Sequence, residues 1–347
     1  MKHTSGRPRI LVARRIPENG IEILRQYFTV DLNNTDKDLT PPALLRRLDG
    51  AFGVIAMMAN RFDRQFISKL ETVKVISNYA VGFDNVDIPA ATEKGIVVTN
   101  TPGVLTDATA DLAFGLLLAV ARRIVEGDRF VRAHKFKGWA PTLMLGYDVS
   151  AKTMGIIGAG RIGAAVAARA RGFGMRILYN SHKRNADIDA IGGTPVELPR
   201  LLEESDYISL NVPLTGETRG MIGKRELALM KPTSVLLNTA RGEVVDEKAL
   251  ITALKRRKIA GAGLDVYVNE PKINPELLKL DNVVLAPHLG SSTLETRAKM
   301  SELAALNAVA VLKGENPPSS VNPGVLRSNQ PLANSFEKKY EGVVESL

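Results

Sequence analysis

The sequence predicts an α/β protein made of two doubly wound domains, in each of which helices cover both faces of a parallel β-sheet. The chain has 347 residues, enough for about two average domains. Short β-branched runs alternate with helical patterns along almost all of it, which is typical of parallel strands joined by crossover helices. Apolar residues make up 45% and charged residues 24%, so the composition is that of a globular protein rather than a disordered one.

The first series of strands occupies the N-terminal part of the chain. We expect strands at residues 9–13, 29–32, 53–57, 73–77 and 96–100, with helices between them. A breaker, Thr101-Pro102-Gly103, comes next, and then a strongly apolar helix at residues 106–124 with Thr106 as its N-cap. A helix this apolar must be buried, either inside one domain, or between domains or against a second subunit.

The second series begins after residue 150. We expect strands at residues 153–157, 176–179, 207–211, 234–238, 261–266 and 283–286. These strands predict a second doubly wound domain. A long helix is expected at residues 292–312, and the proline- and glycine-rich segment 314–323 ends the compact part, which leaves a polar tail from about residue 326.

Composition argues against several classes of site and partner. The chain has no cysteine, which excludes disulfides, thiolate catalysis and cysteine-ligated metals, and no metal site is expected. The longest apolar run, residues 112–121, is about half of a membrane span, and residues 1–8 lack the hydrophobic region of a signal peptide. The net charge is +9, but the cations are scattered. We therefore expect a cytoplasmic protein without a membrane or nucleic-acid partner.

A glycine-rich turn is the first feature that indicates a ligand. Gly158-Ala159-Gly160-Arg161-Ile162-Gly163 follows a predicted strand and opens a predicted helix at residues 162–170. In this context the glycines permit a tight turn, let the backbone approach a pyrophosphate and let the helix pack closely on the strand. The helix N-terminus adds free N–H donors and a positive dipole. The turn therefore predicts a dinucleotide site, with a plain tight turn as the alternative.

The segment after the next strand indicates which dinucleotide is bound. NAD-binding domains carry an acidic residue about 20 positions beyond the glycines, where it binds the ribose 2′-hydroxyl. Here the strand runs into Asn180-Ser181-His182-Lys183-Arg184, which offers a hydroxyl and two fixed cations to a 2′-phosphate and no carboxylate to repel one. We expect NADP to be preferred, with NAD possible. A solvated basic loop is the alternative.

Polar residues also follow later strands of this series. Ligands of open α/β sheets bind beyond the carboxyl ends of the strands, where Arg241, Asp265 and His288 are expected to lie. Each alone could be a turn or cap residue, and Glu270 ahead of Pro271 could be a solvated loop acid. Their joint occurrence in a dinucleotide-binding domain favours an active site.

The ordered motifs of the chain resemble those of the D-isomer-specific 2-hydroxyacid dehydrogenases. The resemblance spans about residues 8–325 and is greatest to the glyoxylate/hydroxypyruvate reductase branch. The motifs that carry it are residues 78–87 (NYAVGFDNVD), 100–103 (NTPG), 158–163 (GAGRIG), 238–242 (NTARG), 263–267 (GLDVY) with 270–271 (EP), and 286–290 (APHLG). These motifs are specific for the family and much less so for the substrate.

The resemblance implies a layout of domains. A flavodoxin-like substrate domain, residues 1–104 and 287–325, would surround an inserted Rossmann cofactor domain, residues 105–286, with residues 326–347 as a C-terminal tail. It also implies a homodimer built on the cofactor domains, in which the helix at residues 106–124 and the following arm to about residue 146 form the contact. The active site would lie in the cleft between the domains.

The resemblance further implies a reaction, the reduction of a short 2-keto acid to a D-2-hydroxy acid. His288 would donate the proton, since imidazole titrates near neutral pH. Glu270 would bind the other ring nitrogen and stabilise the imidazolium. Arg241 would hold the substrate carboxylate and polarise the carbonyl, and the backbone N–H groups of Val81 and Gly82 would bind the remaining carboxylate oxygen.

Other positions match cofactor contacts of the family. Thr109, Arg161, Ile162 and Ala240 correspond to such contacts. Asp265 corresponds to a residue near the nicotinamide amide, with a buried structural cap as the alternative role.

The substrate pocket departs from the family pattern. In the glyoxylate reductase branch an aromatic residue of the partner's arm often lies near the substrate. Trp139 lies in this arm, but Leu143 aligns closer to the aromatic position. With Met57 and Met144 as further apolar walls, the pocket would admit glyoxylate, hydroxypyruvate or a sugar-derived acid such as 2-ketogluconate.

An alternative function of another class is a dinucleotide-sensing protein similar to corepressors. A pure sensor has no need to keep the set of Arg241, Glu270 and His288, which favours the enzyme.

Overall fold

The computed structural model describes residues 7–328, which divide into two compact units. Among the described residues, one unit is made of residues 7–105 and 293–328, and the other of Thr106–Ser292. The first unit therefore comes from both ends of the chain. It resumes at Thr293, a few residues later than the position 287 expected from the sequence. Each unit contains one parallel sheet covered by helices, and the predicted α/β class with two parallel-sheet domains is confirmed.

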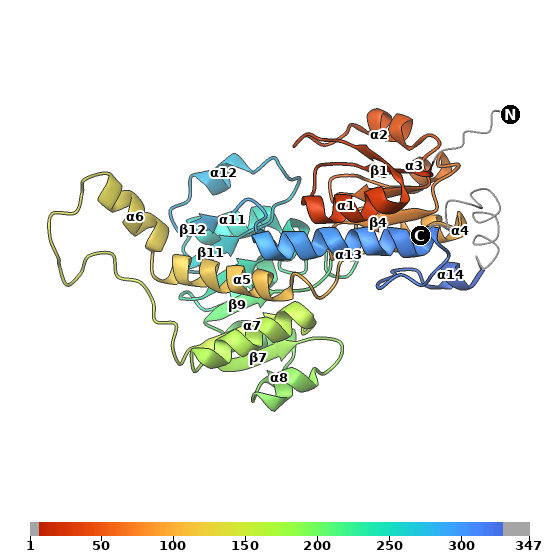
Figure 1. The fold of residues 1–347 in the computed structure, drawn as a ribbon. Coiled ribbons are helices and arrows are strands. Elements are labelled where there is room, and N and C mark those ends of the chain that lie inside the picture. Colours follow the sequence, from red (N-terminus) through yellow and green to blue (C-terminus); the bar gives the residue numbers. More distant parts are fainter. Residues whose placement is uncertain (1–6, 329–347) are drawn as a thin grey trace. The chain divides into compact units, whose positions relative to one another are not determined.

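The first unit contains a five-stranded parallel sheet. Its order is β2-β1-β3-β4-β5 (Figure 1). The strands are β1 (Arg9–Val12), β2 (Thr29–Leu32), β3 (Gly53–Ala56), β4 (Val75–Asn78) and β5 (Val97–Thr99). Four of these strands are almost entirely buried, which explains why they read as continuous apolar runs.

The predicted strands of this unit match these bounds closely, and the small differences lie at the strand ends. Met57 was expected to end a strand, but its N–H instead binds Oδ1 of Asn60 at 2.8 Å. The strand β3 therefore stops one residue earlier, at Ala56.

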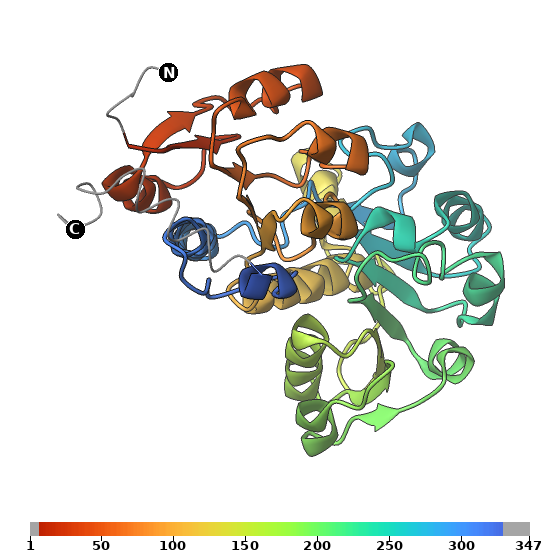
Figure 2. The same ribbon diagram turned by 90° about the vertical axis from the view of Figure 1, so that its right-hand side faces the viewer.

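Six helices complete the described part of the first unit. They are α1 (Glu18–Tyr27), α2 (Pro41–Leu48), α3 (Arg64–Ser68), α4 (Ile88–Glu93), α13 (Leu294–Leu312) and α14 (Gly324–Ser328). The long α13 lies beside α1 in Figures 1 and 2 and packs against β3 and β4. The close approach of α1 and α13 requires Gly20, since a Cβ there would clash with Ser301. In this way the C-terminal part of the chain completes the N-terminal domain.

The second unit contains a seven-stranded parallel sheet of order β12-β11-β10-β9-β6-β7-β8. The strands are β6 (Thr153–Ile157), β7 (Arg176–Asn180), β8 (Thr194–Pro195), β9 (Tyr207–Leu210), β10 (Val235–Asn238), β11 (Gly261–Leu264) and β12 (Val283–Leu285). Six of the seven were expected from the sequence. The exception, β8, is a two-residue exposed edge strand that has no apolar pattern to reveal it.

The helices of the second unit lie between these strands. They are α5 (Thr106–Ala121), α6 (Ile124–Arg132), α7 (Arg161–Gly172), α8 (Ala186–Ala190), α9 (Leu198–Glu204), α10 (Lys224–Leu229), α11 (Glu247–Lys255) and α12 (Pro275–Leu278), with a short 3₁₀ turn at Gly242–Val244. The apolar pattern predicts a helix that continues to residue 124, but α5 ends at Ala121 because Arg123 takes a left-handed conformation with φ of 55°.

The apolar helix α5 is buried inside its own unit. It packs against α7 and against strands β10 and β11, and seven of its residues are buried. Of the alternatives left open by the sequence, burial within one domain therefore accounts for its apolar face.

The two ends of the chain lie outside the described part. The predicted tail from residue 326 begins within α14, where Val325 is 2% exposed, and residues 329–347 are outside the described residues. Within residues 7–328, no helix is both long and apolar enough to cross a membrane.

Candidate active site

The glycine-rich turn joins β6 to α7 in the second unit. Gly158 has φ of 95°, and a Cβ there would lie 2.7 Å from the carbonyl oxygen of Asn211. A Cβ on Gly163 would clash with the carbonyl oxygen of Gly158, whereas space is open around Gly160. The first and third glycines are thus required by the fold, and the second leaves room for another molecule.

The N-terminus of α7 is directed at this open space. Gly160 is its N-cap and provides no side-chain cap, so the first N–H groups of the helix are left for a ligand. Asn185 donates from Nδ2 to the carbonyl oxygen of Ala159 at 2.8 Å. Since C=O and N–H point in opposite directions across a trans peptide, this bond turns the N–H of Gly160 away from Asn185. The turn therefore fits the pyrophosphate of a dinucleotide.

The loop after β7, which the sequence indicates as the 2′-phosphate site, is exposed from Ser181 to Arg184. Two carboxylates that the local sequence pattern does not reveal lie beside it. Nε of Arg184 is 3.2 Å from Oδ2 of Asp189, and Nε2 of His182 is 3.7 Å from Oε2 of Glu217. These acids come from α8 and from the loop after β9, so a search at the end of β7 alone cannot find them.

A histidine–carboxylate pair lies at the carboxyl ends of the last strands. Nδ1 of His288 is 2.8 Å from Oε2 of Glu270, and Oε1 of Glu270 accepts the N–H of Tyr267 at 2.9 Å. Both side chains are about one-third exposed, 32% for His288 and 34% for Glu270. Because Nδ1 is engaged by the carboxylate, Nε2 is the ring nitrogen left for chemistry.

Opposing effects act on the carboxyl group of this pair. Burial raises the pKa of Glu270, but the hydrogen bond and charge of His288, the N–H of Tyr267 and the charge of Arg241 together hold that pKa below its ordinary value. Glu270 is therefore ionised at neutral pH, as a partner for an imidazolium must be.

Asp265 fixes the segment that carries His288. Its backbone oxygen accepts the N–H of His288 at 2.9 Å, and its carboxylate oxygens accept the N–H groups of Leu289 at 2.6 Å and Gly290 at 2.8 Å. His288 itself is left-handed, with φ of 56°, a conformation that needs such support. Of the two roles considered for Asp265, the structural cap is thus observed directly.

The cap is a buried carboxyl group. Asp265 is 1% exposed, and burial raises its pKa above the ordinary value, although the two N–H donors and the charge of His288 act in the opposite direction. Thr109 of α5, expected to contact the cofactor, holds the same segment by donating from Oγ1 to the carbonyl oxygen of Gly290 at 3.1 Å.

Arg241 lies in the turn after β10, which a buried asparagine organises. Asn238 is 1% exposed, accepts the N–H of Ala240 at Oδ1 and donates from Nδ2 to the carbonyl oxygen of Arg241, at 3.0 and 2.9 Å. The guanidinium donates to the carbonyl oxygen of Ala240 at 2.7 Å, and its charge acts on Glu270. The second unit therefore brings together Arg241, Glu270 and His288 beyond the ends of β10, β11 and β12, of which β11 and β12 are labelled in Figure 1.

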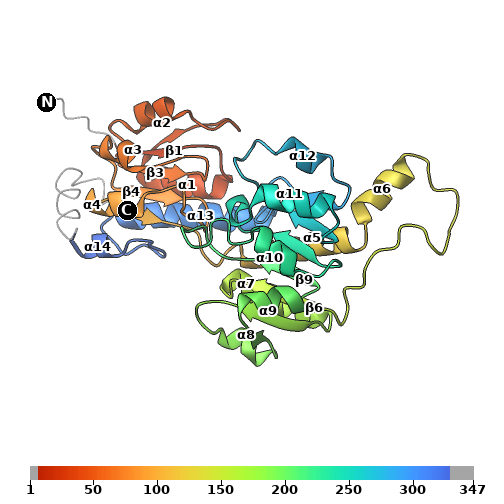
Figure 3. The same cartoon turned by 180° about the vertical axis from the view of Figure 1, so that it is seen from behind.

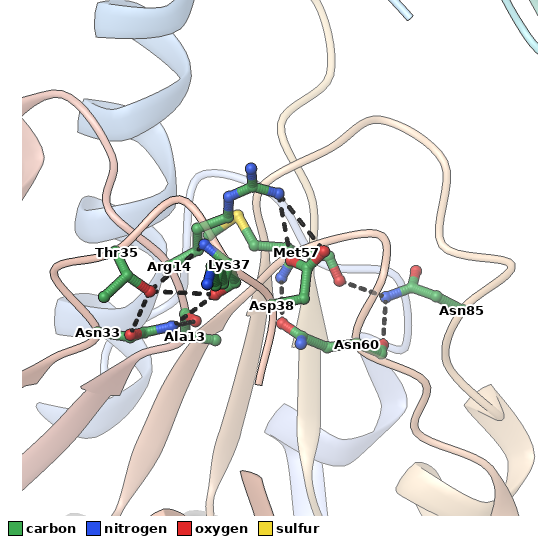
Figure 4. Close-up of polar contacts among 9 residues, drawn as sticks. All are labelled: Ala13, Arg14, Asn33, Thr35, Lys37, Asp38, Met57, Asn60 and Asn85. Carbon is green, nitrogen blue, oxygen red and sulfur yellow. Dashed lines mark hydrogen bonds and ion pairs between the residues drawn. The ribbon is translucent and has the colours of Figure 1, made fainter. Parts of the chain in front are cut away.

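The remaining predicted residues are spread over both units. Val81 and Gly82 are half-buried in the loop after β4 of the first unit. Met57 belongs to the same unit and directly follows β3. Figure 4 shows the side chains that fix this end of the sheet, with Asn85 donating to the backbone oxygens of Met57 and Asn60 at 3.3 and 3.1 Å. Leu143, Met144 and the 84%-exposed Trp139 belong to the segment after α6 of the second unit.

Residues 114–290 match the family model described as D-isomer specific 2-hydroxyacid dehydrogenase, NAD binding domain. A glyoxylate reductase from Thermococcus litoralis is 52% identical over 330 residues, which cover 94% of this chain and 100% of that protein. The chain belongs to the D-isomer specific 2-hydroxyacid dehydrogenases. As a member of this family it is an NAD(P)-dependent enzyme that interconverts 2-hydroxy and 2-keto acids, and a nicotinamide dinucleotide is its cofactor.

Solved structures of similar proteins support the same family membership. The crystal structure of a protein from Thermus thermophilus is 44% identical, with a TM-score of 0.85 over 90% of this chain and 99% of that one. An NADPH-dependent glyoxylate/hydroxypyruvate reductase from Sinorhizobium meliloti, solved with NADP and malonate, is 33% identical, with a TM-score of 0.82 over 91% and 97%. The glyoxylate reductase branch of the D-2-hydroxyacid dehydrogenases, to which the sequence motifs pointed, is thereby confirmed.

Proposed function

We propose that the chain is an NADPH-preferring reductase that converts glyoxylate and hydroxypyruvate to D-2-hydroxy acids. The observation that carries this proposal is the His288–Glu270 pair beside the charge of Arg241, on the same sheet edge as a turn that fits a dinucleotide. The names of the relatives from Thermococcus litoralis and Sinorhizobium meliloti support the choice of substrates.

His288 is the proton donor in this reaction. The bound nicotinamide supplies the hydride that reduces the carbonyl carbon. Nε2 of the imidazolium gives its proton to the carbonyl oxygen, so that one keto acid, one hydride and one proton yield one hydroxy acid. Glu270 keeps the Nδ1 proton in place and stabilises the imidazolium before transfer.

The substrate carboxylate is held by charge and by backbone donors. The planar guanidinium of Arg241 offers paired donors to it and polarises the neighbouring carbonyl. The N–H groups of Val81 and Gly82 bind the remaining carboxylate oxygen. Met57, Leu143 and Met144 form the apolar wall that sets the size of the substrate.

Cofactor selection depends on the loop after β7. The hydroxyl of Ser181 and the cations of Lys183 and Arg184 bind the 2′-phosphate of NADP, together with His182. Asp189 and Glu217 compensate part of this positive charge, which allows NAD as the weaker alternative. The pyrophosphate is held by the glycine-rich turn, through Gly158, Gly160, Arg161, Ile162 and Gly163. The nicotinamide end of the cofactor site is lined by Thr109, Ala240 and Asp265.

The active form is a homodimer. Most of the large apolar side chains exposed in residues 7–328 lie in the segment 124–147, among them Trp139 at 84%, Leu145 at 67% and Val131 at 58%. In Figures 1 and 3 this arm extends away from the rest of the second unit. A monomer would leave these side chains in water, whereas a second copy of the chain would cover them.

A substrate panel tests this function. The loss of nicotinamide absorbance is followed with NADPH and with NADH for glyoxylate, hydroxypyruvate, pyruvate, phenylpyruvate and 2-ketogluconate. Glyoxylate and hydroxypyruvate should give the highest kcat/KM, and NADPH should exceed NADH. Preferred turnover of 2-ketogluconate would indicate a different reductase of the family, and turnover of none would contradict the proposal in favour of a binding protein.

A further inference from the structure

The loop after β4 contains two consecutive peptides whose carbonyl groups are held by asparagine side chains. Asn100 donates from Nδ2 to the carbonyl oxygen of Val81 at 2.8 Å. Asn78 donates from Nδ2 to the carbonyl oxygen of Gly82 at 2.7 Å. Asn78 is the last residue of β4 and Asn100 directly follows the neighbouring strand β5, so the loop is fixed from the carboxyl ends of the sheet.

These bonds determine where the N–H groups of the loop point. Across a planar trans peptide, C=O and N–H are antiparallel. Asn100 therefore turns the N–H of Gly82 away from itself, and Asn78 does the same for the N–H of Phe83. Within residues 7–328, the N–H groups of Val81, Gly82 and Phe83 donate no hydrogen bond. The loop thus presents a run of unused donors, a backbone arrangement suited to an anion.

A residue from the far end of the chain sets the orientation of Asn100. The hydroxyl of Ser319 donates to Oδ1 of Asn100 at 2.6 Å, so that Nδ2 is the end of the amide that faces Val81. The fully buried Asn307 of α13 fixes Ser319 in turn, accepting its N–H at 2.9 Å and donating to the carbonyl oxygen of Asn100 at 3.0 Å. Ser319 lies beyond α13, in the proline-rich segment before α14.

Asn78 connects the same loop to Met57, which is expected to form part of the wall of the substrate pocket. Asn78 is fully buried, and its side-chain amide pairs with that of Asn85 at 3.1 and 3.2 Å. Asn85 donates to the backbone oxygens of Met57 and Asn60, the contacts drawn in Figure 4. The Val81–Phe83 donors and the Met57 loop are therefore one hydrogen-bonded assembly.

We propose that Ser319, through Asn100, is a positioning residue that aims the backbone donors of Val81 to Phe83 at the carboxylate of the substrate, with Asn78 fixing the second peptide. This inference rests on the proposed function, because that function supplies the carboxylate. It assigns a role in substrate binding to the segment between α13 and α14, more than 200 residues from the loop that it orients.

Ser319→Ala tests the inference, with Ser320→Ala as its matched control. Ser320 is the next residue, and its buried hydroxyl has no hydrogen-bond partner among residues 7–328, so that its removal breaks no bond within them. Ser319→Ala should raise KM for glyoxylate and for hydroxypyruvate by the same factor, about fivefold. The factor is the same because the loop donors bind the carboxylate, which both substrates contain. kcat, KM for NADPH and Tm should change little. Ser319→Thr keeps the hydroxyl and should restore the wild-type KM.

A second variant and a binding measurement keep the outcome decisive. Asn100→Asp places an acceptor against the carbonyl oxygen of Val81 and should raise KM about tenfold or more. The affinity of the NADP-loaded proteins for oxalate, measured by calorimetry, should fall in the same order as KM rises. Equal oxalate affinity and KM in Ser319→Ala and Ser320→Ala would overturn the inference and leave the proposed function standing. Absence of turnover in the wild type would overturn the proposed function, while oxalate binding still decides the inference.

Discussion

At the scale of single residues, the candidate site depends on short polar side chains that hold the backbone of its loops, either their own or a neighbouring one. Asn238 holds the turn of Arg241, Asp265 holds the segment after His288, and Asn100 holds Val81. Each lies at or just beyond the end of a parallel strand. Such side chains can form hydrogen bonds with the backbone N–H and C=O groups of loops, which have no partner in the sheet. Asparagine and aspartate are therefore suited to these positions.

The Glu270 carboxylate provides the most direct residue-scale prediction. The pKa of Glu270 lies below its ordinary value, so its charge is present at neutral pH and is lost only as the pH falls through that lowered pKa. Glu270→Gln keeps a hydrogen-bonding side chain but removes the charge that stabilises the imidazolium. The variant should therefore lose activity on the alkaline side at a lower pH than the wild type, with kcat for reduction down about tenfold or more.

The pH dependence of kcat/KM for glyoxylate reduction checks this prediction, with the Kd of NADPH as a control for a general disturbance. Identical alkaline limbs in the variant and the wild type would show that Glu270 does not support the proton donor.

At the scale of elements, the regular strands and helices follow from the sequence pattern, whereas the end of α5 and the exposed edge strand β8 do not. Most predicted strands match within one or two residues because buried parallel strands are continuous apolar runs. The end of α5 was missed, since Arg122 and Arg123 look like the last turn of a helix until the left-handed φ of Arg123 is known. The exposed β8 had no apolar signal.

The same limit applies to the site. The glycine-rich turn and the positions of Arg241 and His288 follow from local patterns in the sequence. The partners Asp189 and Glu217 of the loop after β7 do not, because they come from other elements that only the fold brings near. The Ser319 contact to Asn100 is the extreme case, since no local pattern connects residues so far apart.

The loop after β7 provides an element-scale prediction. In Ser181→Asp, a carboxylate takes the place where the 2′-phosphate of NADP is expected to bind. Its repulsion should raise KM for NADPH by about tenfold or more and leave KM for NADH nearly unchanged. Steady-state kinetics with both cofactors measure this selectivity, and Ser181→Ala separates lost hydrogen bonding from added repulsion. An unchanged ratio of the two KM values would contradict the role of this loop.

At the scale of the whole molecule, the chain carries a net charge of +9. Many of the arginines, such as Arg47, Arg64 and Arg169, are paired with carboxylates of their own unit. Some of the positive charges, such as those of Arg241 and Lys183, have proposed uses with small anions. An excess of positive charge is consistent with a protein whose ligands carry phosphates and carboxylates.

Assembly gives a prediction at this scale. Light scattering should find a mass of twice the 37.6 kDa of one chain. Leu145→Asp combined with Trp139→Asp introduces charges into the apolar arm and should shift the protein towards one chain, whereas Leu278→Asp, at an exposed leucine of α12, should not. A wild type that runs as one chain at micromolar concentration would contradict the homodimer.

The central claim concerns chemistry at His288, and one comparison tests it most directly. Glyoxylate reduction by NADPH is measured for the wild type and for His288→Ala, with NADPH binding followed by nicotinamide fluorescence in the same samples. The wild type should turn over, and His288→Ala should bind NADPH with unchanged Kd while losing at least about a hundredfold in kcat. Equal turnover by the two proteins would contradict the assignment of His288 as the proton donor.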